Sequence, residues 1–197
     1  MNIGTRDITA VILAGGQGRR MGGQDKGLIM FNGKPLVSIL IEKLEQQSVE
    51  IIINANRNQQ RYLELGYPVI TDQLADYQGP LAGFASAMDR VTTDFIVTLP
   101  CDSPLLVADY VARFIASCEQ NDAPVHVAFD GERLQPVHAL IKVGLLPGLI
   151  EFLDSGDRKI DRWYALHDFV QADFSDCADM FRNINTPSDQ QALQDQQ

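Results

Sequence analysis

Cysteine is scarce in this sequence: there are three, Cys101, Cys118 and Cys177, and they are widely spaced. No CxxC pair and no Cys/His cluster with zinc spacing occurs, which excludes a disulfide framework and the usual kinds of structural zinc site. Long apolar runs are also missing, because none approaches the ~20 residues that a membrane-spanning helix needs. The short apolar run near the N-terminus is too brief for a secretion signal. We therefore expect a cytoplasmic chain with no membrane partner.

Positive charge is in short supply as well. The chain has 16 Lys and Arg against 26 Asp and Glu, a net charge of −10, which argues against a nucleic-acid polymer as partner. The exception is the stretch 15–34, where Arg19, Arg20, Lys26 and Lys34 accompany a single acid, Asp25. A small positive island in an acidic chain suits a compact polyanion such as a triphosphate, although ordinary surface charge explains it equally well.

Five nearly continuous apolar runs predict buried parallel strands, and helical patterns lie between them. The predicted strands are residues 10–13, 50–54, 67–70, 94–99 and 124–129, and residues 136–141 are predicted as a further, antiparallel strand. Strands that alternate with helices imply right-handed βαβ units. The fold we expect is α/β: a three-layer sandwich around a mainly parallel, Rossmann-like sheet, in a single domain over residues 1–197.

Two apolar stripes at helical spacing, over residues 36–44 and 106–115, predict amphipathic helices. Ser103 followed by Pro104 predicts the start of the second helix, with the serine as N-cap and the proline at the first helical position. Thr186 and Pro187 repeat that signal farther along the chain. In a sheet of this kind ligands bind beyond the carboxyl ends of the strands, so the segments that follow the predicted strands are candidates for a site.

The first predicted strand leads directly into a glycine-rich segment, LAGGQGRRMGGQDK, at residues 13–26. Glycines allow a tight turn that brings backbone N–H groups against phosphate oxygens, while Arg20 and Lys26 supply cations for those oxygens. Two common loops do not fit, because Met21 stands where the dinucleotide motif needs glycine and Gln24 where the P-loop needs lysine. The segment instead matches the loop of nucleotidyltransferases that use NTP donors. A merely flexible turn is the alternative.

Asp102 follows the apolar run 94–99, within the sequence Pro-Cys-Asp-Ser-Pro. A carboxylate at a strand end suits Mg²⁺, which one or two carboxylates hold together with substrate phosphates and waters. The alternative is that Asp102 helps to cap the next helix, a task that Ser103 already fills. Cys101 is interpreted as a packed side chain and not as a nucleophile, because no histidine stands at a spacing that predicts thiolate activation.

Asn54 ends the second predicted strand and Asp72 follows the third, where a nucleoside would lie in such a fold. A carboxylate can accept hydrogen bonds from N1–H and N2–H₂ of guanine together, and pyrimidines do not offer that pair of donors on one edge. Turn formation by Asn and Asp is the alternative. Gly79, in the segment GPLAG, would let the backbone approach a ligand ahead of a helix whose N-terminus favours anions.

Asn183 and Asn185 lie on either side of Ile184, so their side chains share one face if the segment is extended. Two amides on one face suit a heterocycle rich in donors and acceptors, such as a pterin. The alternative is a turn that caps the following helix together with Thr186 and Pro187.

The segments LAGGQGRRMGGQDK, NGKPL, GPLAG, PCDSP and NINTP, with the asparagine and aspartate of the nucleoside side, extend in order from residue 13 to residue 187. In this combination the chain resembles the molybdenum cofactor guanylyltransferases. The resemblance implies a fold like that of the nucleotide-diphospho-sugar transferases, with a nucleotide-binding half over residues 8–105 and an acceptor-binding half over residues 106–190. It implies transfer of GMP from GTP to molybdenum-bound molybdopterin, with release of pyrophosphate and a requirement for Mg²⁺.

The same resemblance implies residue roles. Arg20, Lys26 and Asp102 would be catalytic, with Asp102 as the metal ligand, and Asn183 and Asn185 would bind the acceptor. The residues that would contact GTP are Leu13, Ala14, Gly15, Gly16, Gly22, Lys26, Asn54, Asp72, Gly79 and Asp102. The sister cytidylyltransferases typically read LAAG at the start of the loop, so the LAGG of this chain favours guanine.

GTP and molybdopterin are the partners that the resemblance implies, and other cofactor-assembly proteins and molybdoenzyme precursors are expected at the level of the family. We expect a monomer. Within the same class, the alternative is a sugar-phosphate or cytidylyl-type nucleotidyltransferase, which shares the loop and the strand-end aspartate. From another class, the alternative is a non-catalytic nucleotide-binding regulatory module. Lys26 and Asp102 argue against that module, because binding alone does not need a metal at the α-phosphate.

Overall fold

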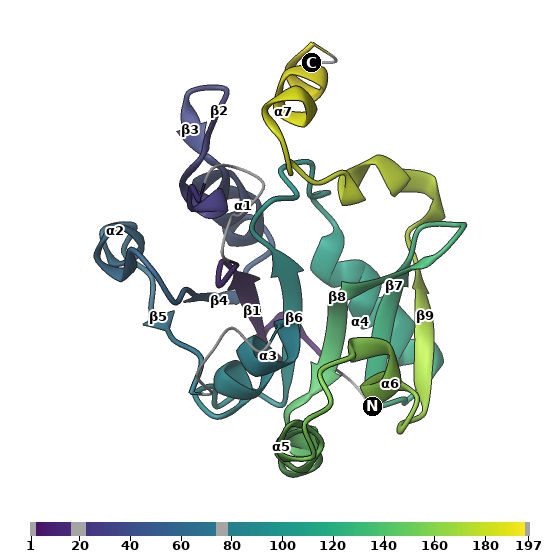
Figure 1. Cartoon of the computed structure of the whole chain (residues 1–197). Coiled ribbons are helices and arrows are strands. Elements are labelled where there is room, and N and C mark those ends of the chain that lie inside the picture. Colours follow the sequence, from purple (N-terminus) through teal and green to yellow (C-terminus); the bar gives the residue numbers. More distant parts are fainter. Residues whose placement is uncertain (1–2, 17–22, 74–78, 196–197) are drawn as a thin grey trace.

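A computed structural model describes residues 3–16, 23–73 and 79–195, which form a seven-stranded sheet with helices around it (Figure 1). The strand order is β5-β4-β1-β6-β8-β7-β9, and β8 runs antiparallel to both of its neighbours. The strands are β1 Ile8–Leu13, β4 Glu50–Asn54, β5 Val69–Ile70, β6 Phe95–Pro100, β7 Val125–Phe129, β8 Leu134–Lys142 and β9 Phe169–Asp173. A separate hairpin pairs β2 (Met30–Phe31) with β3 (Lys34–Pro35).

The α-helices cover both faces of the sheet, which confirms the three-layer α/β prediction (Figure 1). They are α1 Leu36–Glu45, α2 Gln59–Leu63, α3 Pro80–Met88, α4 Tyr110–Gln120, α5 Leu146–Asp154, α6 Ile160–Tyr164 and α7 Pro187–Gln194. Short 3₁₀ helices are η1 Thr5–Asp7, η3 Lys26–Leu28, η4 Val143–Leu145 and η5 Ser175–Phe181.

Alternating side chains of the inner strand β1 point into two separate layers of the core, as the pleat of a strand requires. Ile12 of β1 is buried in the layer that α1 and α4 cover, whereas Val11 is buried in the layer beneath α3 and α5. The strand is therefore apolar on both faces, which is why β1 reads as a continuous apolar run in the sequence.

The predicted strands are all present, with ends that differ by two residues at most. The strand predicted as antiparallel is β8, and its pairing confirms that direction. Sequence reasoning missed β9, because its residues FVQAD lie at the sheet edge and are mostly exposed, so they give no apolar run. It also missed the β2–β3 hairpin, although Asn32 and Gly33 form the turn between those strands with positive φ angles of 48° and 81°.

The predicted start of the second amphipathic helix is wrong. The helix α4 begins at Tyr110, and residues 103–109 form turns. The hydroxyl of Ser103 donates to Asn183 Oδ1 at 2.6 Å, and Leu106 is already buried before the helix starts. These tertiary contacts outweigh the local Ser-Pro signal. Thr186, by contrast, caps α7 as predicted, and its hydroxyl accepts a hydrogen bond from the N–H of Asp189.

The sheet continues through both predicted halves of the chain, since β1, β4, β5 and β6 precede residue 106 and β7, β8 and β9 follow it. The division into a nucleotide half and an acceptor half stays a prediction. Within the parts of the chain that the structure describes, no helix combines the length and the apolar character that crossing a bilayer requires.

Candidate active site

Three chain segments meet where β1, β4 and β6 end. These strands are parallel neighbours, and Leu13 at the end of β1 is in register with Asn54 of β4 on one side and Pro100 of β6 on the other. The strand order reverses at β1, because β4 and β5 extend to one side of it and β6 to the other. Such a reversal is where open α/β sheets bind their ligands.

Lys26, Asp102 and Asn185 form the centre of this site. The Lys26 ammonium donates to Asp102 Oδ2 at 2.7 Å and to Asn185 Oδ1 at 2.6 Å. Asp102 is only 6% exposed, and its Oδ1 is buried with no hydrogen-bond partner among the described residues. Because a buried carboxylate oxygen normally has a partner, this free oxygen is a position that an added cation could fill.

The residue before Lys26, Asp25, is a buried aspartate that tertiary hydrogen bonds hold in place. Asp25 is 8% exposed, and its two oxygens accept hydrogen bonds from Tyr62 Oη at 2.5 Å and from Asn58 Nδ2 at 3.0 Å. Burial first, and then the neighbouring Cys101 and Asp25, raise the pKa of Tyr62, so its hydroxyl stays protonated and donates a hydrogen bond to the Asp25 carboxylate. A Cβ at Gly27 would stand 2.5 Å from Tyr62 Oη, so any larger residue there would displace the Tyr62 hydroxyl.

The carboxylate of Asp72 is held by two amides from the end of β4. Asn54 Nδ2 donates to Asp72 Oδ1 at 2.9 Å, and Asn56 Nδ2 donates to Asp72 Oδ2 at 2.7 Å. The backbone N–H of Asp72 returns a hydrogen bond to Asn56 Oδ1 at 2.8 Å. The structure thus brings together Asn54 and Asp72, the pair predicted on the nucleoside side. It adds Asn56, whose only signal in the sequence is that it is a second asparagine two residues after the strand-end Asn54.

Gly15 and Gly83 have no side chain, and the amide groups of Asn54 and Asn56 occupy the space that a side chain there would need. A Cβ at Gly15 would lie 2.9 Å from Asn56 Nδ2 and 3.3 Å from Asn54 Oδ1. A Cβ at Gly83, on α3, would lie 2.8 Å from Asn54 Oδ1. Ahead of that helix, Gly79 has a φ of 82°, in the left-handed region that favours glycine. Gly15 of LAGG and Gly79 and Gly83 of GPLAG therefore each have a steric or conformational reason in this structure.

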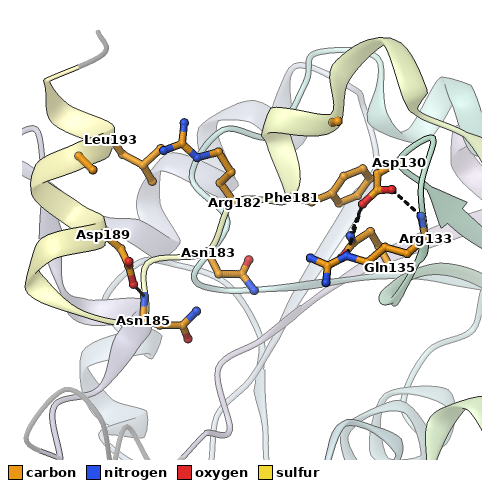
Figure 2. A pocket seen from close by; sticks show the side chains of 11 residues that line it. Asp130, Arg133, Gln135, Phe181, Arg182, Asn183, Asn185, Asp189 and Leu193 are labelled. Carbon is orange, nitrogen blue, oxygen red and sulfur yellow. Dashed lines mark hydrogen bonds and ion pairs between the residues drawn. The ribbon is translucent and has the colours of Figure 1, made fainter.

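The segment with Asn183 and Asn185, the two asparagines predicted to bind the acceptor, lies against the end of β6. The N–H of Ile184 donates to the carbonyl of Asp102 at 2.9 Å, and Asn183 Oδ1 accepts from Ser103. Both asparagines line an open pocket of about 380 Å³ (Figure 2). Its lining residues are Asp130, Arg133, Gln135, Ala178, Phe181, Arg182, Asn183, Asn185, Asp189, Ala192 and Leu193. Figure 2 shows the asparagines on the stretch before α7, with Asp130, Arg133 and Gln135 across from them.

Cys101 and two histidines are packed in the core. Burial, and then the charges of Asp102 and Asp25, raise the pKa of the Cys101 thiol well above its usual value, so this residue is no thiolate nucleophile at neutral pH. His126 is fully buried, with Nδ1 2.7 Å from Ser117 Oγ. His138 is 3% exposed, and burial lowers its pKa to about 3.

Some of the residues implied by the family resemblance have a clear place and others do not. Ala14 is buried beside the β4 strand end, where its N–H donates to the Asn54 carbonyl at 2.8 Å, and Gly16 is exposed. Arg20 and Gly22 lie outside the described residues. Lys34, part of the positive stretch in the sequence, pairs with Glu42 at 2.7 Å on the surface.

Known proteins with similar sequences share one description. Residues 10–171 match the family model of the MobA-like NTP transferase domain. A molybdenum cofactor guanylyltransferase of Shewanella sp. (strain ANA-3) is 51% identical over 186 residues, which cover 94% of this chain and 94% of that protein. These similarities extend over nearly the same stretch as the motifs.

Solved structures agree with the fold. The molybdopterin-guanine dinucleotide biosynthesis protein A of Archaeoglobus fulgidus has a TM-score of 0.77 at 21% identity, over 95% of this chain and 97% of that one. A Mycobacterium tuberculosis protein solved in complex with manganese has a TM-score of 0.69 at 15% identity, over 95% of this chain and 98% of that one. At these identities the matches speak for the fold alone.

Proposed function

Because this chain belongs to the molybdenum cofactor guanylyltransferase family of MobA-like NTP transferases, we propose that it transfers GMP from GTP to molybdenum-bound molybdopterin. The family makes the chain a nucleotidyltransferase. What we propose is that GTP is its donor, molybdenum-bound molybdopterin its acceptor and Mg²⁺ its metal. The observation that carries the proposal is the contact of Lys26 with both Asp102 and Asn185. That contact joins the glycine-rich segment, the end of β6 and the acceptor pocket at one point.

The triphosphate of GTP would bind at the glycine-rich segment, next to Lys26. A divalent cation fits the same place, because Asp102 Oδ1 is buried and finds no hydrogen-bond partner in the part of the chain that the structure describes, while Oδ2 is occupied by Lys26. Mg²⁺ suits a site with one carboxylate, since phosphates and waters supply its other ligands. When bound there, the ion would neutralise charge that develops on the phosphates. The manganese complex of the M. tuberculosis protein supports a divalent metal in this fold.

The reaction we propose is an in-line displacement. A terminal phosphate oxygen of the acceptor forms a bond to the α-phosphorus of GTP, and the bond from that phosphorus to the bridging oxygen breaks, so pyrophosphate leaves with the electron pair. The nucleophile is already anionic at neutral pH, and no side chain has to remove a proton from it. The protein's part is to position both substrates and to place Lys26 against the phosphates. Arg20 would add a second cation.

Guanine would be read by Asp72. The amides of Asn54 and Asn56 hold its carboxylate in one orientation, and each carboxylate oxygen has a further lone pair for N1–H and N2–H₂ of the base. A carboxylate fixed before the ligand arrives loses little conformational entropy on binding. Gly15 supports this role, since an alanine there would press on the side chain of Asn56.

The acceptor would bind in the pocket beside Asn183 and Asn185. These amides offer donors and acceptors to a pterin ring, and Phe181, which is 8% exposed, offers an apolar wall. Arg133 lies at the pocket with its side chain 79% exposed, where it can meet a phosphate. Asn185 accepts a hydrogen bond from Lys26 and also forms part of the pocket wall. An acceptor bound in the pocket would therefore have its phosphate near the GTP phosphates.

Pyrophosphate release tests the proposal directly. The purified chain is given each NTP with Mg²⁺, with and without molybdenum-loaded molybdopterin. We expect release with GTP and only in the presence of the acceptor. Release with CTP, or with a sugar phosphate as acceptor, would assign the chain to the related nucleotidyltransferases. If the chain binds GTP but shows no turnover under any condition, it is a non-catalytic regulatory module.

Partner proteins belong to the same proposal. We expect the chain to act as a monomer in the cytoplasm and to contact other cofactor-assembly proteins and molybdoenzyme precursors only to hand over its product. Sedimentation of the isolated chain checks the first expectation, and a dimer at assay concentrations would contradict it.

A further inference from the structure

One guanidinium group joins two distant points of the glycine-rich segment. Arg57 Nη2 donates to the carbonyl of Gly16 at 3.0 Å, and Nη1 donates to the carbonyl of Gly23 at 3.1 Å. Gly16 and Gly23 are the described residues on either side of residues 17–22, so the two hydrogen bonds link the start of the segment to its later part. The reaction proposed above assigns no role to Arg57.

The backbone around Arg57 is itself fixed. Its neighbour Asn56 exchanges two hydrogen bonds with Asp72, and its other neighbour Asn58 donates to the buried Asp25. The connection between β4 and α2 therefore supports the carboxylate of Asp72, the residue before Lys26 and, through Arg57, the glycine-rich segment. A side chain that starts from so constrained a backbone can hold the carbonyls of Gly16 and Gly23 in place.

The chemistry of the bonds favours a positioning role. A guanidinium is planar and presents its donors in a rigid fork, which allows it to span two acceptors at once. In a trans peptide the N–H points away from the C=O, so a carbonyl of Gly23 directed at Arg57 turns the N–H of Gln24 away from it. Holding these carbonyls thus fixes both the spacing of the segment and the direction of its amides.

We propose that Arg57 is a positioning residue that holds Gly16 and Gly23 at the spacing with which the glycine-rich segment binds the triphosphate. This inference rests on the proposed function, because it takes GTP as the ligand. Arg57 acts through the backbone and has no need to touch the substrate. Without the link, the binding energy of GTP would have to bring Gly16 and Gly23 to this spacing, which weakens binding.

Three variants test the proposal in the full-length chain: Arg57→Ala, Arg57→Lys and the control Arg61→Ala. Arg61 lies on α2 and is exposed. Its substitution by alanine removes the same charge as Arg57→Ala, from the same part of the surface. The measurements are the Kd for GTP with Mg²⁺ by calorimetry, KM and kcat in the pyrophosphate assay, and amide hydrogen exchange without nucleotide in peptides that contain Gly16 and Gly23. Melting temperatures show that each variant is folded, and Arg57→Lys provides the comparison if Arg57→Ala is not.

We expect Arg57→Ala to raise the Kd and the KM for GTP about tenfold, equivalent to ~1.4 kcal/mol, with a smaller change in kcat. Arg57→Lys should give a similar increase, because an ammonium is a point charge that cannot span both carbonyls. Amide exchange in the peptides should be faster in both variants, and Arg61→Ala should match the wild type throughout.

Three results overturn the inference. If Arg57→Lys restores the wild-type Kd, positive charge suffices and the link between the carbonyls has no role. If the wild type binds GTP and Arg57→Ala binds it equally well with unchanged exchange, only the role of Arg57 is wrong. If the wild type itself fails to bind GTP, both this inference and the proposed function are wrong, so the two failures can be told apart.

Discussion

Lys26 and Asp102 are 76 positions apart in the sequence, and their side chains form an ion pair of 2.7 Å at the end of the central strands. The side chain of Asp102 is 9% exposed and that of Lys26 is 23% exposed, so the pair is largely shielded from solvent. Removing one member of such a pair leaves the other charge poorly compensated. Substitutions at either position should therefore be accompanied by a check of stability.

Replacing Asp102 with alanine should abolish turnover. The variant loses the carboxylate proposed to hold the divalent ion, and we expect kcat to fall at least 10²–10³-fold, the scale for losing one electrostatic stabiliser. Asp102→Asn keeps the shape and the contact with Lys26 and should be nearly as inactive, because it lacks the charge. Pyrophosphate release over a Mg²⁺ titration measures both. A rate within threefold of the wild type for Asp102→Asn would contradict the metal role.

Replacing Lys26 with alanine should weaken the use of GTP strongly. We expect kcat/KM for GTP to fall about 100-fold, equivalent to ~2.7 kcal/mol, because the cation proposed to meet the phosphates is gone. Lys34→Ala is the matched control, since Lys34 lies in the same positive stretch but pairs with Glu42 on the surface. Steady-state kinetics with varied GTP separates the two variants, and equal kinetics for both would show that Lys26 is only one surface charge among others.

Gly15 and Asn56 should be coupled. Gly15→Ala places a Cβ 2.9 Å from Asn56 Nδ2, so we expect the KM for GTP to rise at least tenfold in the wild-type background, or ~1.4 kcal/mol. In an Asn56→Ala background the same substitution should cost much less, because its main obstacle is absent. A double-mutant cycle measures this coupling. Additive effects would mean that Gly15 is required for a reason other than the space that Asn56 takes.

The two acceptor-side asparagines should differ in their effects. Asn185 contacts Lys26, so Asn185→Ala should raise the KM for both GTP and the molybdopterin acceptor. Asn183 contacts Ser103 and lines the pocket, so Asn183→Ala should raise the KM for the acceptor and leave the Kd for GTP unchanged. Calorimetry with GTP and kinetics with varied acceptor distinguish them. The opposite pattern would place the acceptor elsewhere.

His138 should make stability depend on pH. Its pKa in the folded state is about 3, below the ordinary 6.5, because burial disfavours the charged ring. The unfolded chain binds the proton more readily, so the stabilisation is complete above pH 6.5 and is lost as pH falls from 6.5 toward 3.

Between pH 6.5 and pH 5 the wild type should therefore lose about 1.5 kcal/mol more of its free energy of unfolding than His138→Gln does. Urea unfolding at the two pH values measures the difference. The quantity compared is the change in the free energy of unfolding between the two pH values. A variant that is less stable at both pH values does not affect this comparison. Equal losses in the two proteins would contradict the assignment.

The strands and the strand-end residues could be predicted from the sequence because each has a local signal. A strand buried on both faces reads as an apolar run, and Asp102 and Asn54 follow such runs directly. The pairing of Asn54 with Asp72 then follows from the parallel order of β4 and β5. Family resemblance supplied the residue roles, which no apolar pattern contains.

Tyr62 and Arg57, which hold other residues of the site in place, could not be predicted, because their partners are distant in the chain. Tyr62 reaches Asp25 across 37 positions, and Arg57 reaches Gly16 across 41. Neither has a local pattern: Tyr62 reads as one more apolar residue of a short helix, and Arg57 as a surface charge. The Ser103 cap failed for a related reason, since its hydroxyl bonds to Asn183, 80 positions away.

The contact between Asn185 and Lys26 spans 159 positions. During synthesis a ribosome must add all of those residues after Lys26 before the two side chains can meet. Contacts so distant in sequence are entropically costly to close and tend to close late. A nascent chain could thus hold a finished sheet and the glycine-rich segment while residues 183–185, which form one wall of the pocket in Figure 2, are still missing. Translation that stops before residue 183 would yield a polypeptide without that wall.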